Sequence, residues 1–382
     1  MTAASIAVVG AGPVGLAAAA LLADGGHDVA LVAPAAPADR RTSALLAGSV
    51  ALLTRLGVWP DLAEDAAPLR TMRIVDGTRR LIRAPEVAFE ASEIGLDAFG
   101  YNVANKALVA ALERGVAARN IRRIDALAES AALNEGSVVV SLASGEQVVA
   151  RLVVAADGRR SKLRDAAGIT TTEWRYAQAA LVCDFAHTLP HRDTSTEFHT
   201  EHGPFTLVPL PGNRSSLVWV DTPEQSQRRL ALPDDALASE IERRSASILG
   251  KVTVEGGRQV FPLSGLSVRS FAANRIALVG EAAHVFPPIG AQGLNLGYRD
   301  VAALGDVIAD PTGDPGAPDR LAAYDGARRV DVMSRTAAVD TVNRTLLSDF
   351  LPASALRGLG LFLVDRVPRL RRFAMRQGLA AL

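Results

Sequence analysis

Glycine residues close to the N-terminus have the spacing of a phosphate-binding turn. The sequence Gly10-Ala-Gly12-Pro13-Val14-Gly15 follows the G-x-G-x-x-G pattern. In this pattern the first glycine makes a tight turn, the second lets the backbone approach a pyrophosphate, and the third lets a helix pack closely on a strand. The exposed N–H groups and the positive dipole end of that helix favour an anion. The turn therefore predicts a dinucleotide site, the alternative being a glycine-rich turn without a ligand.

The elements around the turn are those that such a site needs. Residues 6–9 are apolar on both faces, as in a central parallel strand, and a helix is expected from Pro13. A second strand, Val29–Val32, follows the Gly25-Gly26 pair. In sites of this kind an acidic residue after the second strand usually binds the adenosine ribose. Here Ala33 stands in that place. Asp39 or a backbone group could take its place, or that bond could be absent.

Two further segments carry glycine and carboxylate residues directly after buried strands. Asp157-Gly158 follows the apolar run 151–156, and the segment 278–297 reads LVGEAAHVFPPIGAQGLNLG. Asp-Gly is also a common turn after a strand, so its meaning depends on the other two segments.

Composition narrows the class of protein. The 382 residues include 49% hydrophobic and 21% charged residues, which is ordinary for a folded enzyme of about two domains. Lys plus Arg and Asp plus Glu are equal at 41 each, so charge gives no indication of a nucleic-acid partner. Cys183, the only cysteine, lies in an apolar run and is interpreted as a core residue in a reducing compartment. The six histidines form no metal-binding pattern, so no metal is expected.

The long apolar run 6–23 could be mistaken for a signal peptide or a membrane span. No Lys or Arg precedes it, and Gly and Pro interrupt it. We therefore expect no membrane-spanning helix.

The order of elements predicts an α/β fold: a Rossmann-like, three-layer domain with a parallel sheet, an inserted, mostly antiparallel β-sheet domain, and a C-terminal helical segment. Helices are expected over about 45–56, 105–118, 234–249 and 293–308, and a hairpin over 138–149. The first domain is expected to consist of 1–71, 100–171 and 266–382, and the substrate domain of 72–99 and 172–265.

Together, the three glycine-containing segments resemble those of the single-component flavin aromatic hydroxylases, the family of p-hydroxybenzoate hydroxylase, over nearly the whole chain. Shorter stretches are most similar to the ubiquinone-biosynthesis hydroxylases within this family. These stretches are 41–45, 57–59, 100–105, 176–178 and 203–211.

The resemblance implies an FAD-dependent monooxygenase that uses NAD(P)H and O2, and that hydroxylates the ring of a polyprenylated phenol through a flavin hydroperoxide. The alternatives are hydroxylation of another aromatic compound, and an inactive flavin-binding scaffold. The absent acid at Ala33 and Glu281, which stands where the family has Asp, are the departures from the pattern.

The same resemblance assigns roles to individual residues. FAD would be bound by residues from all three segments and by Arg41. These residues are Gly10, Gly12, Pro13, Val14, Gly15, Arg41, Asp157, Gly158, Gly280, Glu281, Gly290, Gly293, Leu294 and Asn295. The carbonyl of Pro288 would face the substrate hydroxyl. Gln178, Phe205, Leu207 and Pro287 are candidates for the substrate pocket. His284 is expected to brace the flavin loop.

The C-terminal segment 359–375 mixes apolar residues with several arginines. It predicts either a contact with a membrane surface or with partner enzymes, or an ordinary closing helix with a solvated basic face. The expected location is cytoplasmic, with a peripheral position at the inner face of the membrane as the alternative.

Overall fold

The first sheet holds the predicted glycine turn. In the computed structural model, which describes residues 1–35, 39–78, 85–287, 292–347, 367, 369, 371, 372 and 375, eight strands form this sheet. Six of them lie in the order β17-β18-β11-β1-β2-β8. Their bounds are Ala272–Ala273, Ile276–Leu278, Gln147–Ala155, Thr2–Val9, Val29–Val32 and Ile121–Ile124. The pairs from β18 to β8 are parallel, so these strands end at one edge of the sheet.

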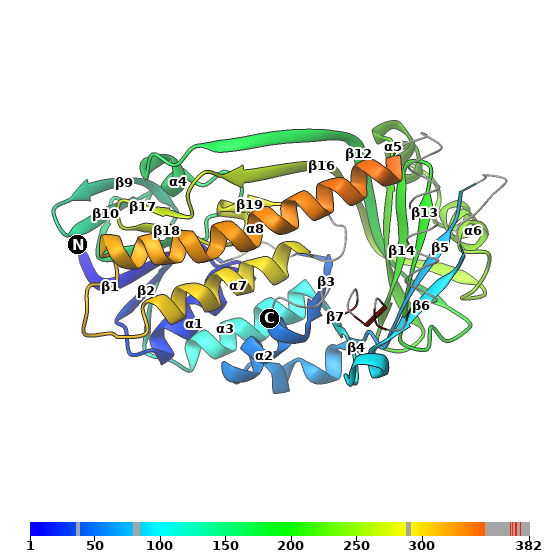
Figure 1. Ribbon diagram of the computed structural model, residues 1–382, viewed down its shortest axis with the longest axis horizontal. Helices are drawn as coiled ribbons and strands as arrows, with labels where there is room; N and C mark the ends of the chain where they lie inside the picture. The colour runs from blue at the N-terminus through cyan, green and yellow to red at the C-terminus, as the bar shows by residue number, and fades with distance from the viewer. Residues whose placement is uncertain are drawn as a thin grey trace.

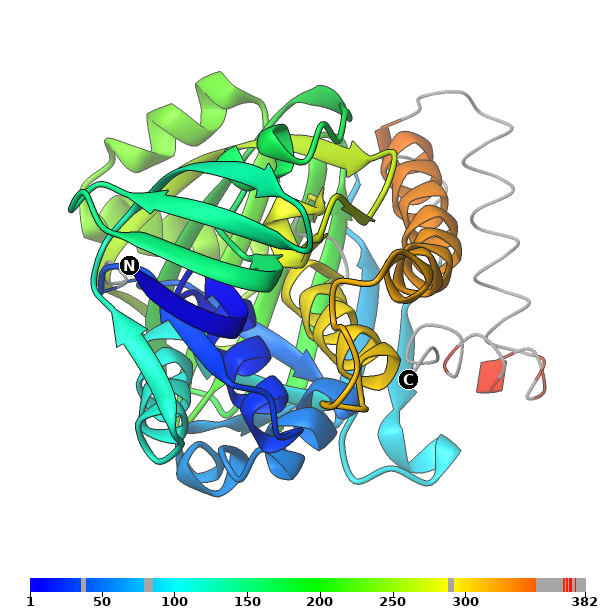
Figure 2. The ribbon, with the colours of Figure 1, turned by 90° about the vertical axis from the view of Figure 1, so that its left-hand side faces the viewer.

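Helices and a hairpin cover this sheet. Helix α1 (Pro13–Asp24) consists of small apolar residues, is almost completely buried, and contacts α3 (Asn105–Ala117) and α7 (Gln292–Val307). Strands β9 (Ala128–Asn134) and β10 (Ser137–Leu142) lie on the side away from α1 and α3 (Figure 2). The short helix α4 (Lys162–Ala166) contacts β9.

A second sheet of eight strands is antiparallel except for one pair. Its order is β19-β16-β12-β15-β14-β13-β5-β6, and β13 and β5 are parallel (Figure 1). The bounds are His284–Val285, Val252–Val268, Thr171–His187, Arg214–Asp221, Gly203–Leu210, Thr194–Thr200, Thr71–Asp76 and Val87–Glu90. One face packs on α6 (Asp234–Arg244), and α5 (Pro223–Leu230) contacts β12, β15 and β16. The observed architecture confirms the predicted α/β fold class.

A third, small sheet lies between the two large ones. It has the order β3-β7-β4, with bounds Thr42–Leu46, Gly100–Ala104 and Ala67–Pro68. Helix α2 (Ala47–Arg55) follows β3, so the predicted start of this helix at Leu45 was wrong. The apolar spacing of Leu45 and Leu46 fits a helix, but both residues pair in the strand with β7. Short 3₁₀ helices η1 (Trp59–Asp61) and η2 (Ala63–Asp65) lie between α2 and β4, η3 (Ala91–Ile94) follows β6, and η4 (Gly280–Ala282) follows β18.

Helix α8 (Pro318–Leu347) connects the two large sheets. It contacts α7 and β17 on one side and β14 on the other, and it extends along the molecule in Figure 1. No described helix is both long and apolar enough to cross a membrane.

Candidate active site

The glycine turn after β1 is fixed by close contacts between backbone atoms. Gly10 has a φ of +118°, and a Cβ there would lie 2.1 Å from the carbonyl oxygen of Ala156. A Cβ on Gly15 would lie 2.0 Å from the carbonyl oxygen of Gly10. The N–H of Gly10 donates to Val32 O over 2.9 Å. The ends of β1, β2 and β11 and the start of α1 therefore meet in a space that admits only glycine at both positions.

Gly12 is different, because its surroundings are open. No heavy atom lies within 4 Å of where its Cβ would be. It caps α1 without a side-chain hydrogen bond, and the first helical bond runs from Leu16 N to Gly12 O (3.0 Å). The N–H groups of Val14 and Gly15 precede that bond and have no partner within the helix. This end of α1 therefore offers donors beside open space, as a pyrophosphate requires.

Asp157 follows the adjacent strand β11 and has one unpartnered oxygen. Its Oδ2 accepts from Leu163 N (3.4 Å), whereas Oδ1 is buried and has no hydrogen-bond partner in the described part of the chain. Burial raises the pKa of this carboxyl group, against the lowering effect of Ser161 and backbone N–H groups. Gly158 has a φ of +81° and open surroundings. A buried carboxylate oxygen without a partner is the feature expected at a ligand site.

Glu281 follows β18, the next strand along the same edge. Gly280, with a φ of +62°, packs against the Val14 side chain of α1 and donates its N–H to Asp300 Oδ2 (2.9 Å). Glu281 itself is exposed, and its charge contributes to the raised pKa of Arg41. The three predicted segments therefore meet at the carboxyl ends of β1, β11 and β18, which is where open parallel sheets bind ligands.

A buried charged network supports the Gly280 turn. Asp300 is fully buried and pairs with His284 Nε2 (2.7 Å) and Arg328 Nε (2.7 Å). Arg328 also pairs with Asp331 (2.6 Å), which pairs with Arg299 (2.7 Å). His284 therefore braces the loop through Asp300, as the sequence predicted.

The start of α7 completes the third segment. Gly293 is exposed with open space around its Cβ position, and Leu294 is half-buried. The side chain of Asn295 joins α7 to the third sheet and α2: it accepts from Leu46 N (2.8 Å) and Ser49 Oγ (2.6 Å), and it donates to Ala44 O (2.8 Å). The predicted residues Pro288 and Gly290 lie outside the described residues, and Pro287 is buried.

Arg41 lies beside the exposed Glu281 and is held by Asp39. Its Nη2 is 2.8 Å from Asp39 Oδ2, and its guanidinium carbon is 5.5 Å from the centre of the Phe261 ring. The hydrogen bond to Asp39 is the main cause of the raised pKa of Arg41. Burial acts to raise the pKa of Asp39, but hydrogen bonds from Arg41 and Asn105 outweigh it and lower that pKa. Asp39, the predicted replacement for the ribose-binding acid, is therefore already engaged by protein groups.

Two of the predicted pocket residues have their side chains on the other face of the second sheet. Phe205 and Leu207 pack with Trp219 and α6 in a buried cluster, so placing them on the pocket floor was wrong. Successive residues of a strand point to opposite faces of the sheet. The prediction chose the residues of β14 whose side chains point away from the candidate site. Gln178 is buried and donates from Nε2 to His202 O (2.7 Å).

The face of the second sheet that points toward the candidate FAD site is identified by its contacts with the third sheet. Ser216 on β15 lies 2.9 Å from Thr42 Oγ1 and near Asn102 of β7. Asp184 of β12, directly opposite Ser216, places a half-buried carboxylate on this face, and burial raises its pKa. Five other residues on the same face in β12, β14, β15 and β16 are apolar or uncharged and half-buried. They are Val182, Thr206, Val208, Val218 and Phe261. The sequence analysis missed them, although the alternation within each strand could have identified this face once one contact was known.

These residues fit FAD. The space beside Gly12, the N–H groups at the start of α1, the unpartnered oxygen of Asp157 and the exposed carboxylate of Glu281 lie along one edge of the first sheet. No group of three or more His, Cys, Asp or Glu residues in the described part of the chain could bind a metal ion.

Comparison with known proteins agrees with this site. Residues 3–338 match the family model described as "FAD binding domain". The chain is 36% identical to a protein named ubiquinone hydroxylase UbiL from Rhodospirillum rubrum, over 99% of this chain and 90% of the relative. It is 33% identical to the 3-demethoxyubiquinol 3-hydroxylase of Escherichia coli, over 98% of each chain.

Solved structures show the same fold at lower identity. The p-nitrophenol 4-monooxygenase PnpA of Pseudomonas putida superposes with a TM-score of 0.80 at 18% identity and 99% coverage of both chains. HpxO of Klebsiella pneumoniae, solved with FAD and uric acid, gives a TM-score of 0.78 at 18% identity, covering 98% of this chain and 96% of HpxO.

Proposed function

Because the chain belongs to the FAD-binding-domain family and is an FAD-dependent monooxygenase, we propose that it hydroxylates the ring of a polyprenylated phenol in ubiquinone biosynthesis. NAD(P)H and O2 are the co-substrates. The names of the two relatives described above support this substrate class. The relatives' identity extends over nearly the whole chain, including the sheet that faces the cofactor side.

The observation that carries the proposal is a group of half-buried apolar side chains on the face of the second sheet that carries Ser216. Val182, Val208 and Val218 lie on this face, together with Phe261 beside Arg41. Covering half-buried apolar groups with an apolar ligand is favourable by about 25 cal/mol for each Å² of apolar surface that is removed from water. A phenol with an apolar prenyl chain is therefore a substrate that can bind against this face.

When bound, FAD supplies the reduction by NAD(P)H, the activation of O2 and the transfer of oxygen. The protein's contribution is binding and electrostatics. Gly12 and the first turn of α1 would hold the pyrophosphate with Asp157 near it, and Glu281 would accept hydrogen bonds from the ribityl chain. The N-terminus of α7, near Gly293, stabilises negative charge on the ring system by about 0.3–2 kcal/mol.

The remaining assignments follow from the resemblance. Pro288 orients the phenol hydroxyl through its carbonyl, Gly290 binds FAD, and Pro287 and Gln178 belong to the wall of the substrate pocket. The domains are divided as in the sequence analysis, so that most of the second sheet belongs to the substrate domain, whereas β19 and the last three residues of β16 belong to the first domain. In this arrangement the phenol lies between the cofactor edge of the first sheet and the apolar face of the second.

We further propose that the protein binds peripherally to the membrane, where a polyprenylated substrate resides. Arg369 and Arg372 are exposed, whereas Arg371 pairs with Glu93 (2.5 Å). Two of the basic residues are thus available to anionic lipid headgroups. Co-sedimentation with anionic vesicles tests this: the double variant Arg369→Glu/Arg372→Glu should pellet less than the wild type, and equal pelleting would contradict it.

Turnover with a homologous series of phenols tests the substrate class. The FAD-loaded protein is given the same phenol with no prenyl group, a short one and a long one, and hydroxylated product is measured together with NAD(P)H consumption. The proposal expects kcat/KM to rise with prenyl length. Equal or higher activity on the unprenylated phenol would overturn the substrate assignment and favour an enzyme for another aromatic compound.

A further inference from the structure

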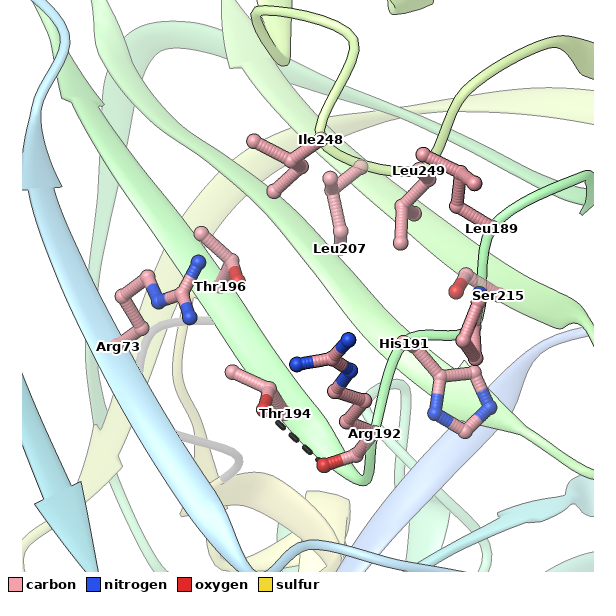
Figure 3. Close-up of a pocket in the computed structure, with 11 residues that line it drawn as sticks. Arg73, Leu189, His191, Arg192, Thr194, Thr196, Leu207, Ser215, Ile248 and Leu249 are labelled. Carbon is pink, nitrogen blue, oxygen red and sulfur yellow. Dashed lines mark hydrogen bonds between the residues drawn. The ribbon is translucent and has the colours of Figure 1, made fainter.

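A cavity lies on the far face of the second sheet, away from the candidate active site. Its volume is about 250 Å³ (Figure 3). Arg73, Thr196 and Leu207 pair in register across β5, β13 and β14 and form one row of its lining. Ser215 also lines the cavity, whereas its neighbour Ser216 contacts Thr42 on the opposite face. The thickness of the sheet therefore separates this cavity from the cofactor side.

One end of the cavity is positively charged. Figure 3 shows the guanidinium groups of Arg73 and Arg192 directed into the same space, beside Thr194 and Thr196. Arg192 has a φ of +52° and its carbonyl accepts from Thr194 Oγ1 (3.1 Å). Two arginines and the Thr196 hydroxyl converge on one space and form a set of donors for an oxyanion, whereas the Thr194 hydroxyl already donates to Arg192 O.

The loop that carries Arg192 is braced by His191. The imidazole Nε2 donates to Leu210 O (3.0 Å), and Nδ1 accepts from Asp193 N (3.0 Å). With both ring nitrogens used in this way, His191 holds the loop against β14. The position of Arg192 is therefore set by the fold and does not depend on a ligand.

Acidic residues neutralise this end of the cavity only in part. None of its lining residues is Asp or Glu. Glu86, which is mostly exposed, forms an ion pair with Arg73 Nε (3.3 Å), and Asp193 pairs with Arg70 (3.1 Å). Arg192 makes no ion pair with any residue that the structure describes. The cavity therefore keeps a net positive charge that an anion can balance.

The other end of the cavity is apolar. In Figure 3 the side chains of Leu207, Ile248, Leu249 and Leu189 lie together above the two arginines. Leu189 is 50% exposed, which is unusual for a large apolar side chain and leaves apolar surface for a ligand to cover. A bound anion would thus have its charged group at the arginines and its apolar part against these side chains.

We propose that this cavity binds a small amphipathic anion, namely a carboxylate or phosphate monoester with a short apolar chain. Its volume lies just below the about 300–1,000 Å³ of typical small-molecule sites, which limits the ligand to a headgroup and a few carbon atoms. The anion could be a free metabolite or the headgroup region of an anionic lipid. Both sources share the same chemistry at the site.

Calorimetric titration with hexyl phosphate tests the proposal on the full-length, FAD-loaded protein. We expect one site per chain, no binding of neutral hexanol, and weaker binding of inorganic phosphate. Arg192→Gln and Arg73→Gln should each weaken hexyl phosphate binding by about tenfold or more, because a charge-assisted hydrogen bond is lost. Arg243→Gln, at an exposed position of α6 outside the cavity, is the matched control and should bind as the wild type does.

The apolar half is tested separately by Ile248→Ser. This variant should lower the affinity for hexyl phosphate and leave that for inorganic phosphate unchanged. Equal affinity of the wild type for hexyl phosphate and inorganic phosphate would overturn the proposed contact with the ligand's apolar chain. Hexyl phosphate binding that is insensitive to both arginine variants would overturn the proposed anion site. Flavin absorbance in each variant verifies that the fold is intact.

The source of the ligand is distinguished with vesicles. Co-sedimentation with phosphatidylglycerol vesicles that is reduced in Arg192→Gln, but not in Arg243→Gln, would identify a lipid headgroup. Arg192-dependent binding of soluble hexyl phosphate without vesicle binding would identify a free anion. Either result supports the amphipathic anion site.

Discussion

The carboxylate of Asp300 accepts the backbone N–H of Gly280 over 2.9 Å. This bond joins the middle of helix α7 to the turn that presents Glu281 at the edge of the first sheet. The same carboxylate pairs with His284 and Arg328, and all three side chains are buried. One buried side chain of α7 therefore fixes the conformation of the Gly280–Glu281 turn.

Asp300→Asn is expected to destabilise the protein by about 1–3 kcal/mol, because it removes the charge that Arg328 Nε faces, while Asp331 stays paired with Arg328 Nη1. Urea unfolding of the apoprotein measures this change. Asp306→Asn, at an exposed position of the same helix, is the control and should stay within about 0.5 kcal/mol of the wild type. Equal stability of the two variants would contradict the role of the network.

Gly10→Ala and Gly12→Ala should have different effects although the positions are two residues apart. An Ala side chain at Gly10 would lie 2.1 Å from Ala156 O at a φ of +118°, so the apoprotein should lose more than the about 1–3 kcal/mol of backbone strain alone. Gly12→Ala meets no protein atom within 4 Å, so apoprotein stability should change little. Its FAD affinity should fall by about tenfold or more, or about 1.4 kcal/mol, because the methyl group occupies the space for the pyrophosphate. Urea unfolding of the apoproteins and a fluorescence titration with FAD measure the two effects, and unchanged FAD affinity in Gly12→Ala would contradict the assignment.

The apoprotein of Asp157→Asn should become more stable relative to the wild type as the pH rises. Burial raises the pKa of Asp157 above its ordinary value of 3.8, so the folded state binds this proton more tightly than the unfolded state does. The stabilising contribution is present below the ordinary pKa and is lost as the pH rises through the raised pKa. Denaturant unfolding from about pH 4 to about pH 7 should therefore show stability rising in the variant relative to the wild type, with weaker FAD binding.

The control for this pH dependence is Asp125→Asn, which changes an exposed carboxylate. The difference in unfolding free energy between this variant and the wild type should be nearly constant over the same pH range. A constant difference for Asp157→Asn as well would contradict the raised pKa.

The sequence predicted those parts of the site that local geometry determines. Gly10 and Gly15 are required by backbone contacts within one strand–turn–helix unit, and Val29–Val32 was predicted with its observed bounds. Phe205 and Leu207 were misplaced because the alternation of a strand does not say which face meets the other sheet. Leu45 and Leu46 were assigned to a helix because strand pairing with β7 is a long-range interaction that overrides local periodicity. The Asp300–Arg328 pair joins residues of two helices, and no local pattern indicates it.

Arg371→Gln is expected to release the C-terminal segment from β6 and η3. Arg371 bonds both oxygens of Glu93 (2.5 and 2.7 Å) and the carbonyl of Ala88, and Met375 packs with Ala91 and Phe99. Hydrogen exchange over residues 88–96 and proteolysis of the C-terminus should both become faster. Arg369→Gln, at an exposed position in the same segment, should exchange as the wild type does.

The same contact should depend on pH. The hydrogen bond from Arg371 lowers the pKa of Glu93 below its ordinary value of 4.5. The stabilisation is therefore present above that value and is lost as the pH falls through the lowered pKa. Protection of residues 88–96 that persists unchanged in acid would contradict this account.

The most direct test of the central claim is the fate of isotopically heavy dioxygen. The purified, FAD-loaded protein is supplied with NAD(P)H, heavy O2 and a prenylated phenol, and the product is examined by mass spectrometry. The account predicts that the new ring hydroxyl carries one heavy oxygen atom and that Gly12→Ala forms less product at limiting FAD. NAD(P)H oxidation without ring-bound heavy oxygen for any phenol would contradict it and would leave a flavin-binding protein that is no hydroxylase.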